Sequence, residues 1–299
     1  MKVKIRIGNE VKEYTGAWED HTLLEVFQEL GITQVHAPCG GNGTCKKCLV
    51  TVEGLGEVLS CQTQCKDGMC VTVAEEQKSA IAENGNCYLY PADAGEGLLA
   101  ACDIGTTTVV CHLLDGATGV RLCTVSAPNA QRSFGADVIS RIQASVDSGL
   151  DKLQSAIVDQ INGMLVQLKQ KAGRTEDIRR LAVAGNTVMS HLFCGLSPES
   201  IGVAPFTPLS LFGESYDAKQ IGIEGCETVY IVPSIAGYVG GDIVADLAAV
   251  QMHSSVLAED GEKETLMLDI GTNGEMVLGK SGSYVCCATA AGPAFEGAE

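Results

Sequence analysis

Positively charged and aromatic residues are scarce in this sequence of 299 residues. Lys and Arg number 20 against 37 Asp and Glu, so the formal net charge is −17, and aromatic residues make up 5%. Such a chain repels nucleic acid and anionic lipid, so we expect neither as a partner. No uninterrupted apolar run reaches the roughly 18 residues of a membrane span, and the first residues lack the apolar core of a signal peptide. We therefore expect a cytoplasmic protein.

Cysteine, by contrast, is abundant. There are 14 cysteines, and seven of them lie between Cys39 and Cys87. A disulfide framework is not expected in a reducing compartment, so thiolate chemistry, usually metal binding, is the better interpretation. The cysteines from Cys87 onward stand mostly among apolar residues, and we interpret them as small core residues.

Residues 1–76 have the element order of a β-grasp domain. Alternating apolar residues predict strands at 3–7, 11–14, 49–52 and 71–73. Thr22 and Glu25 fit a capping box for a helix that stops at Gly31. Residues 77–97 are polar and rich in glycine, which is typical of a linker.

Residues 98–260 predict an α/β lobe, because three consecutive strands are followed by alternating helices and strands. The pattern restarts in residues 261–299. The sequence Asp-Ile-Gly-Thr at 103–106 recurs at 269–272, each time between two apolar strands. This internal repeat indicates a first lobe and the opening hairpin of a second.

The segment from Cys39 to Cys48 indicates an iron–sulfur centre. Five residues separate Cys39 from Cys45, two separate Cys45 from Cys48, and twelve separate Cys48 from Cys61. Four thiolates hold a [2Fe–2S] cluster, and the intervening glycines let backbone amides turn toward its sulfurs. Cys65 and Cys70 are rival fourth ligands, and structural zinc is the weaker alternative metal.

Several segments together resemble one protein family. The cysteine loop is similar to plant- and adrenodoxin-type ferredoxins. The later segments ACDIGTTT, VAGNTVMSHLFCGLSP, APFTP, GYVGGDIVADL, LMLDIGTNGE and AGPAFEGA resemble the reductive activators of corrinoid proteins. That family joins a ferredoxin domain to an ATPase of the acetate kinase–sugar kinase–Hsp70–actin type, so the resemblance implies an RNase H-like lobe. The sequence departs from the pattern at Lys46, where glycine is usual, and in the short gap between Cys48 and Cys61.

The repeated Asp-Ile-Gly-Thr hairpins predict a phosphate site. Glycine leaves room for a phosphate, the following amides form an anion-binding nest, and a carboxylate at the strand end holds Mg²⁺ through water. The resemblance assigns these hairpins, and a connecting segment at 185–187, to nucleotide binding. The carboxylates are Asp103 and Asp269, and the phosphate-binding residues are Gly105, Thr106, Thr107, Gly185, Asn186, Gly271, Thr272 and Asn273.

The resemblance implies ATP-coupled reduction of cobalt(II) to cobalt(I) in a corrinoid protein. Its cofactors would be the [2Fe–2S] cluster, ATP and Mg²⁺, with an upstream low-potential electron donor and a homodimer as further expectations. The alternative is an iron–sulfur electron carrier whose nucleotide lobe only binds or docks. Because the family's sequence continues past AGPAFEGA, we expect poor ATP turnover from residues 1–299 alone.

Overall fold

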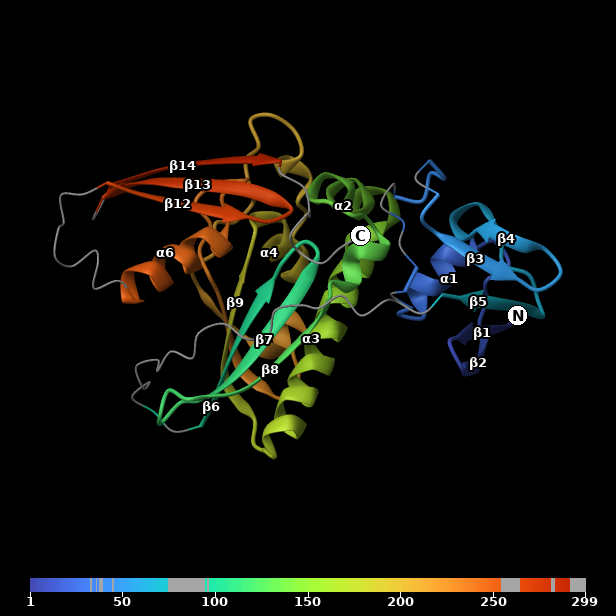
Figure 1. Ribbon diagram of the computed structural model, residues 1–299, viewed down its shortest axis with the longest axis horizontal. Helices are drawn as coiled ribbons and strands as arrows, with labels where there is room; N and C mark the ends of the chain where they lie inside the picture. Colours follow the sequence, from blue (N-terminus) through green and yellow to red (C-terminus); the bar gives the residue numbers. More distant parts are fainter. Residues whose placement is uncertain are drawn as a thin grey trace. The chain divides into compact units, whose positions relative to one another are not determined.

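The computed structural model describes residues 1–32, 34–35, 37, 40–44, 46–74, 95, 97–253, 264–280 and 283–290. The chain divides into two compact units. The first comprises Met1–Ser79 and Ala130–Gly149, and the second comprises Ala80–Asn129 and Leu150–Glu299. Figure 1 shows their elements, which are described below for each unit by itself. Most of the expected linker 77–97 lies outside the described residues.

The first unit is built on a five-stranded sheet in the order β2-β1-β5-β3-β4. β1 pairs antiparallel with β2 and parallel with β5, while β3 pairs antiparallel with both β4 and β5. The alternating Val3, Ile5 and Val71 point inward, as expected from their period of two. The strands are β1 (Lys2–Ile7), β2 (Glu10–Thr15), β3 (Leu49–Val52), β4 (Gly56–Leu59) and β5 (Met69–Val73).

Helix α1 (Leu23–Glu29) covers this sheet, and its start confirms the predicted capping box. The Thr22 hydroxyl accepts from the Glu25 amide, and the Glu25 carboxylate accepts from the Thr22 amide. Leu23, Val26 and Phe27 are buried in the core. A helix that satisfies its first amides and buries one apolar face holds the segments around it in place.

The segment Ala130–Gly149 groups with this first unit, although it follows β8 in sequence. It contains η2 (Ala130–Ser133), α2 (Val138–Ala144) and η3 (Ser145–Gly149). The Gln28 side chain on α1 donates to the carbonyl oxygen of Ser133 over 2.9 Å. Arg141 on α2 is fully buried, and its Nε donates to the carbonyl oxygen of Gly135.

The second unit contains a six-stranded sheet in the order β10-β11-β9-β6-β7-β8. β9 pairs parallel with both β6 and β11, so the hairpin β6–β7 lies beside a strand from later in the chain. The predicted strands are confirmed, and β10 and α5 add to them. The elements are β6 (Leu98–Ile104), β7 (Thr108–Asp115), β8 (Arg121–Pro128), β9 (Ile178–Gly185), β10 (Ser215–Asp217), α5 (Ala218–Ile221) and β11 (Cys226–Ile231).

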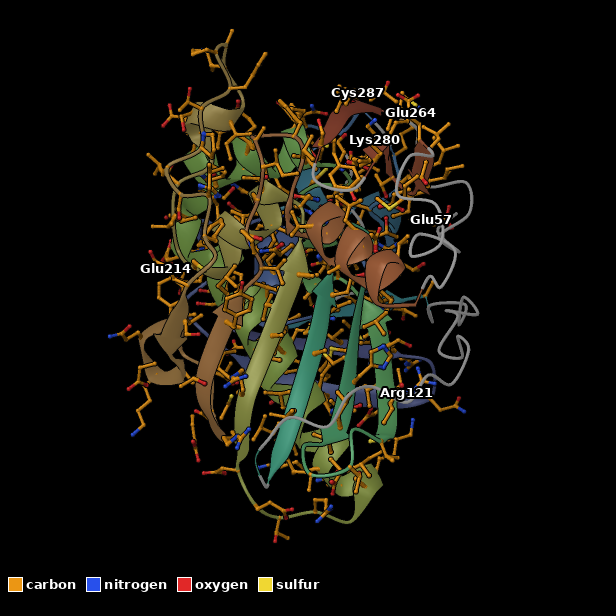
Figure 2. The ribbon with its side chains drawn as sticks, turned by 90° about the vertical axis from the view of Figure 1, so that its left-hand side faces the viewer. Glu57, Arg121, Glu214, Glu264, Lys280 and Cys287 are labelled. Carbon is orange, nitrogen blue, oxygen red and sulfur yellow. The ribbon has the colours of Figure 1, made fainter. Side chains whose placement is uncertain are left out.

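Helices cover both faces of this sheet, as in other α/β lobes. Figure 2 shows α6 (Gly241–His253) in front of the strands, with α3 (Leu150–Ala172) behind them. α3 buries an apolar stripe at helical spacing, from Leu153 to Leu168. α4 (Thr187–Phe193) follows directly after β9. No helix in the described ranges is long and apolar enough to cross a membrane.

A three-stranded antiparallel sheet, β12-β13-β14, follows α6 in the second unit. One face packs on α6, where Ile243 and Val277 are buried and Met267 contacts them. The other face exposes Leu266, Leu268, Ile270, Met276, Leu278 and Val285. The strands are β12 (Thr265–Ile270), β13 (Asn273–Lys280) and β14 (Ser283–Ala290).

Candidate functional site

Two of the predicted cluster ligands, Cys48 and Cys61, lie side by side. The β3–β4 hairpin pairs Leu49 with Leu59, and one step further the Ser60 amide donates to the carbonyl oxygen of Cys48. The two Sγ atoms are 3.3 Å apart, and both side chains are buried. A metal ion shared by two such thiolates offsets their mutual repulsion, so this pair fits an iron site.

The glycines of the cysteine loop take the conformations that the sequence predicts. Gly40, Gly41 and Gly43 have φ of +67°, +88° and +80°, the region that favours glycine. Gly41 also passes close to the fourth-ligand turn, because a Cβ there would lie 3.8 Å from the Cβ of Cys61. Lys46 stands where the family has glycine, and it too has a positive φ of 56°.

Cys39 and Cys45 lie outside the described residues. Within the described ranges, no three His, Cys, Asp or Glu side chains gather into a metal-binding group. The four-cysteine ligand set therefore stays a prediction, carried by the Cys48–Cys61 pair, the glycine loop and the spacing.

The rival ligands Cys65 and Cys70 lie elsewhere in the same domain. The Cys65 amide donates to the carbonyl oxygen of His21, and its thiol is packed in the apolar core. Burial raises the pKa of Cys65, which disfavours the thiolate that a metal needs. Cys70 lies on β5 opposite Lys4.

The first phosphate-type hairpin is the turn between β6 and β7. A Cβ on Gly105 would lie 2.7 Å from the carbonyl oxygen of Thr108, so the turn itself needs glycine there. Asn129, directly after β8, stabilises this turn. Its side-chain amide donates to the Gly105 carbonyl, and its backbone amide donates to the Thr107 carbonyl. Thr106 and Thr107 are buried, whereas Asp103 at the end of β6 is exposed.

The connecting segment lies directly against this first hairpin. Gly185 pairs with Ile104 across the β6–β9 ladder, and Asn186 caps α4 by accepting from the Met189 amide. The side-chain amide nitrogen of Asn186 donates to the Thr106 hydroxyl over 3.1 Å. The structure thus brings the predicted residues 105–107 and 185–186 together at the ends of two parallel strands.

The second hairpin, between β12 and β13, meets the first. The Gly271 amide donates to the carbonyl oxygen of Asn273 and closes the turn. The Thr272 and Thr107 hydroxyls are 2.8 Å apart, although 165 positions separate them in sequence. The two Asp-Ile-Gly-Thr repeats therefore present their turns to one another.

Three acidic residues near Asp269 are functional candidates that the sequence reasoning missed, although the four carboxylates do not converge into one metal-binding group in the described residues. Burial and the nearby charge of Asp269 raise the pKa of Asp242 and of Asp246 to about 6. Glu275 is buried on β13, directly across the ladder from Asp269. The spacing of Asp242 and Asp246, four residues apart on α6, was the available signal that both occupy one helical face.

Gly240 and Gly241 let α6 begin against the connecting segment. A Cβ on Gly240 would lie 2.5 Å from the Cα of Asn186, and one on Gly241 would lie 2.7 Å from the carbonyl oxygen of Val232. These close approaches bring Asp242 to the ends of the strands. Opposed carboxylates there favour a divalent cation, whose charge offsets their repulsion.

His191 is a packed histidine. It is fully buried on α4, its Nδ1 donates to the Thr187 carbonyl, and its Nε2 accepts from the amides of Leu209 and Ser210. Burial lowers the pKa of His191, consistent with a neutral ring that accepts two hydrogen bonds. Its role is to tie residues 209–210 to the helix after the connecting segment.

The other cysteines only partly match the core interpretation. Cys102 and Cys111 are buried opposite each other on β6 and β7, with Sγ atoms 2.6 Å apart. Burial, followed by this contact, raises the pKa of Cys102 well above its usual range. Cys287, in contrast, is exposed on β14, while Cys87 lies outside the described residues.

Three family descriptions match successive parts of the chain. A 2Fe-2S iron-sulfur cluster binding domain matches residues 5–76, the RACo middle region matches residues 98–255, and the C-terminal ASKHA domain of RACo matches residues 263–299. The ferredoxin-type domain and the ASKHA-type fold expected from the sequence are therefore both present.

Similar proteins carry names that concern corrinoid proteins. The corrinoid activation enzyme RamQ of Eubacterium limosum is 31% identical over 94% of this chain and 60% of its own length. A Methanosarcina barkeri reductase of the Co(II) methylated amine-specific corrinoid protein is 27% identical over 66% of this chain and 37% of its own. A solved reductive activator for corrinoid, iron-sulfur protein is 29% identical, with a TM-score of 0.60 over 98% of this chain and 64% of that one. The chain thus spans less than two thirds of these relatives.

Proposed function

Because the chain belongs to the RACo family of reductive activators of corrinoid proteins, we propose that it takes part in nucleotide-dependent reduction of a corrinoid protein. One electron converts cobalt(II) to cobalt(I), and an upstream low-potential donor replaces that electron. The relatives named for corrinoid activation and for reduction of a Co(II) corrinoid protein support the partner class. The observation that carries the proposal is that an iron–sulfur domain and a pair of meeting phosphate-type hairpins occur in one chain.

In this proposal the first unit holds a [2Fe–2S] cluster through Cys39, Cys45, Cys48 and Cys61. The cluster supplies a one-electron carrier. Cys48 and Cys61 contribute a buried, closely spaced thiol pair, and the Gly40–Gly43 loop turns its backbone toward them. The surrounding apolar core excludes water from this side of the site.

The second unit binds Mg²⁺ and ATP in the same proposal. The turns at 105–107 and 271–273 donate backbone amides to phosphate oxygens, with Gly185 and Asn186 fixing the first turn from behind. Asp269 and Asp242 would hold Mg²⁺, and Asp103 lies at the end of the other strand. Mg²⁺ relieves the electrostatic cost that the raised pKa of Asp242 reports.

The contact between Thr107 and Thr272 gives nucleotide a route to a change of conformation. Phosphate entering between the two turns replaces this 2.8 Å contact with bonds from each turn to the same anion. A ligand that bridges the two turns favours the arrangement that fits it, by its differential affinity for that arrangement. This change of conformation would make electron transfer productive.

The test follows cobalt oxidation state by anaerobic absorption spectroscopy. A corrinoid methyl-transfer protein in the cobalt(II) state is mixed with the activator, a strong reductant and Mg-ATP, and growth of the cobalt(I) band is expected. Cys48→Ser should abolish it, and Asp269→Ala should slow it at least tenfold. Equal rates with and without ATP would favour the alternative of an electron carrier with a passive nucleotide module.

A further inference from the structure

Ser60, next to the predicted ligand Cys61, has a side chain that the protein leaves unsatisfied. It is fully buried at the start of η1 (Ser60–Gln62), and its Oγ has no hydrogen-bond partner among the residues that the structure describes. Leaving a buried hydroxyl unpaired is unfavourable, so this group needs an explanation. The backbone of Ser60 is satisfied in the ordinary way, since its amide donates to the Cys48 carbonyl.

The position of Ser60 points to the cluster site. It lies between Leu59, the last paired residue of the hairpin, and Cys61, whose Sγ is 3.3 Å from that of Cys48. Its backbone bond to Cys48 places its backbone next to both cysteines of this pair. The residue on the other side, Gln62, already donates its side-chain amide to the Cys61 Sγ at 3.7 Å and to the Gly41 carbonyl at 3.0 Å. A side-chain donor to sulfur therefore lies on one side of Cys61, and the unused hydroxyl of Ser60 lies on the other.

We propose that the Ser60 hydroxyl donates a hydrogen bond to a sulfur atom of the iron–sulfur cluster and thereby raises its reduction potential. Reduction adds one negative charge to the centre. A donor to sulfur stabilises that added charge more than it stabilises the oxidised form, so it favours the reduced state. Ser60 is a tuning residue in this role and not a ligand.

Thr63 provides a matched control in the same turn. Its hydroxyl donates to the Leu59 carbonyl over 2.9 Å, so it is already used by the protein. Removing that hydroxyl deletes a hydrogen bond within the turn but removes no donor to the cluster. Ser60→Ala and Thr63→Val therefore separate a contact to the cluster from a contact within the turn.

The first measurement is the midpoint potential of the reconstituted full chain, by an electron paramagnetic resonance titration. Ser60→Ala should lower the potential by about 59 mV, the equivalent of a tenfold change in a one-electron equilibrium. Ser60→Thr, which keeps the hydroxyl, should restore most of it, and Thr63→Val should leave it unchanged. An unchanged potential in Ser60→Ala with full iron content would overturn the proposal.

The second measurement uses the cluster-free chain and does not depend on reconstitution. Because the Ser60 hydroxyl has no partner among the described residues, Ser60→Ala in the cluster-free chain should leave the unfolding midpoint in urea unchanged or raise it. Thr63→Val should lower that midpoint because its hydrogen bond is lost. If Ser60→Ala destabilises the cluster-free chain as much as Thr63→Val does, the hydroxyl serves the fold and the proposal is wrong.

Discussion

Lys46 lies in a backbone region that side chains rarely adopt. Its φ of 56° matches the conformation of the neighbouring loop glycines, and its side chain is exposed. A residue with a Cβ pays roughly 1–2 kcal/mol in this left-handed region. Lys46 thus has the backbone conformation that favours glycine, although it carries a side chain.

We therefore expect Lys46→Gly to stabilise the cluster-free chain. Relief of the strain outweighs the extra freedom of glycine in the unfolded state, for a net gain of about 0.5–1 kcal/mol. Urea unfolding measures the change. Lys46→Ala keeps the Cβ and should give no such gain, and equal gains for both variants would show that backbone strain is not the cause.

The contact between Cys48 and Cys61 leads to a prediction about the fourth cluster ligand. Cys61→Ser should lose most of the iron or strongly shift the cluster's absorption spectrum, because a hydroxyl replaces a thiolate beside Cys48. Cys65→Ser should keep the cluster and lose only stability, because Cys65 is a core residue. Iron analysis of the two variants decides between the two cysteines. Loss of iron in Cys65→Ser but not in Cys61→Ser would make Cys65 the ligand.

At the scale of elements, the start of α6 is tightly constrained by the backbone next to it. Gly240 lets α6 begin almost in contact with the backbone of Asn186 and Thr187. The same helix places Asp242 and Asp246 near Asp269 on the neighbouring sheet. One junction therefore sets both the fit of the helix and the acidic side of the proposed Mg²⁺ site.

Gly240→Ala should destabilise the second unit by about 1–3 kcal/mol and weaken Mg-ATP binding, because the new Cβ meets backbone that cannot yield easily. Gly163→Ala on α3 is the control, since a Cβ there has open space and sits within a helix. It should stabilise by about 0.5–1 kcal/mol. Circular dichroism during urea unfolding and calorimetric nucleotide titration measure the two effects, and a neutral Gly240→Ala would contradict the close approach.

The raised pKa of Asp242 predicts that the stability of the folded chain depends on pH. Its pKa is raised from 3.8 to about 6, so the folded state holds this proton more tightly than the unfolded state. Its stabilising contribution is complete below about pH 4 and is lost as pH rises through 6. Asp242→Asn should therefore stabilise the metal-free chain by about 1–3 kcal/mol at pH 8 and by little at pH 4.

Urea unfolding at the two pH values measures that difference. Asp159→Asn is the control, because it removes an exposed carboxylate on α3. A gain from Asp242→Asn that does not depend on pH would show that the carboxylate is not held in its protonated form.

At the scale of the whole molecule, residues of the first unit form a hydrophobic core cluster of their own. The first unit's core lies within residues 3–73, and another cluster joins α6 to the three-stranded sheet of the second unit. The single tryptophan, Trp18, is buried in the first core, and its indole N–H donates to Glu29. Its fluorescence therefore reports on the first unit alone.

We expect Mg-ATP to shift one unfolding transition and not the other. Ligand at 100 times its Kd stabilises the folded state by about 2.7 kcal/mol, and only the second unit carries the proposed nucleotide site. The circular dichroism transition of the helical second unit should move to higher urea, while the Trp18 transition stays in place. Equal shifts of both signals would show that the units unfold together.

Local patterns in the sequence by themselves determined many of the strands, caps and turns of this protein. The strands, the Thr22 capping box, the glycines of the cysteine loop and the paired hairpins each depend on residues within a few positions of one another. Hydrophobic period, capping and the left-handed preference of glycine act at that range, so they can be read from sequence. The family resemblance extended these patterns to a function.

Only the tertiary structure decided which distant residues meet. The β3–β4 hairpin puts Cys61 and not Cys65 beside Cys48, and the insertion of β9 next to β6 brings Asn186 to Thr106. Packing of α6 on β12–β14 places Asp242 near Asp269. Sequence patterns leave such contacts open because strand order and helix packing are set by burial of the whole core, to which residues far apart in the chain contribute together.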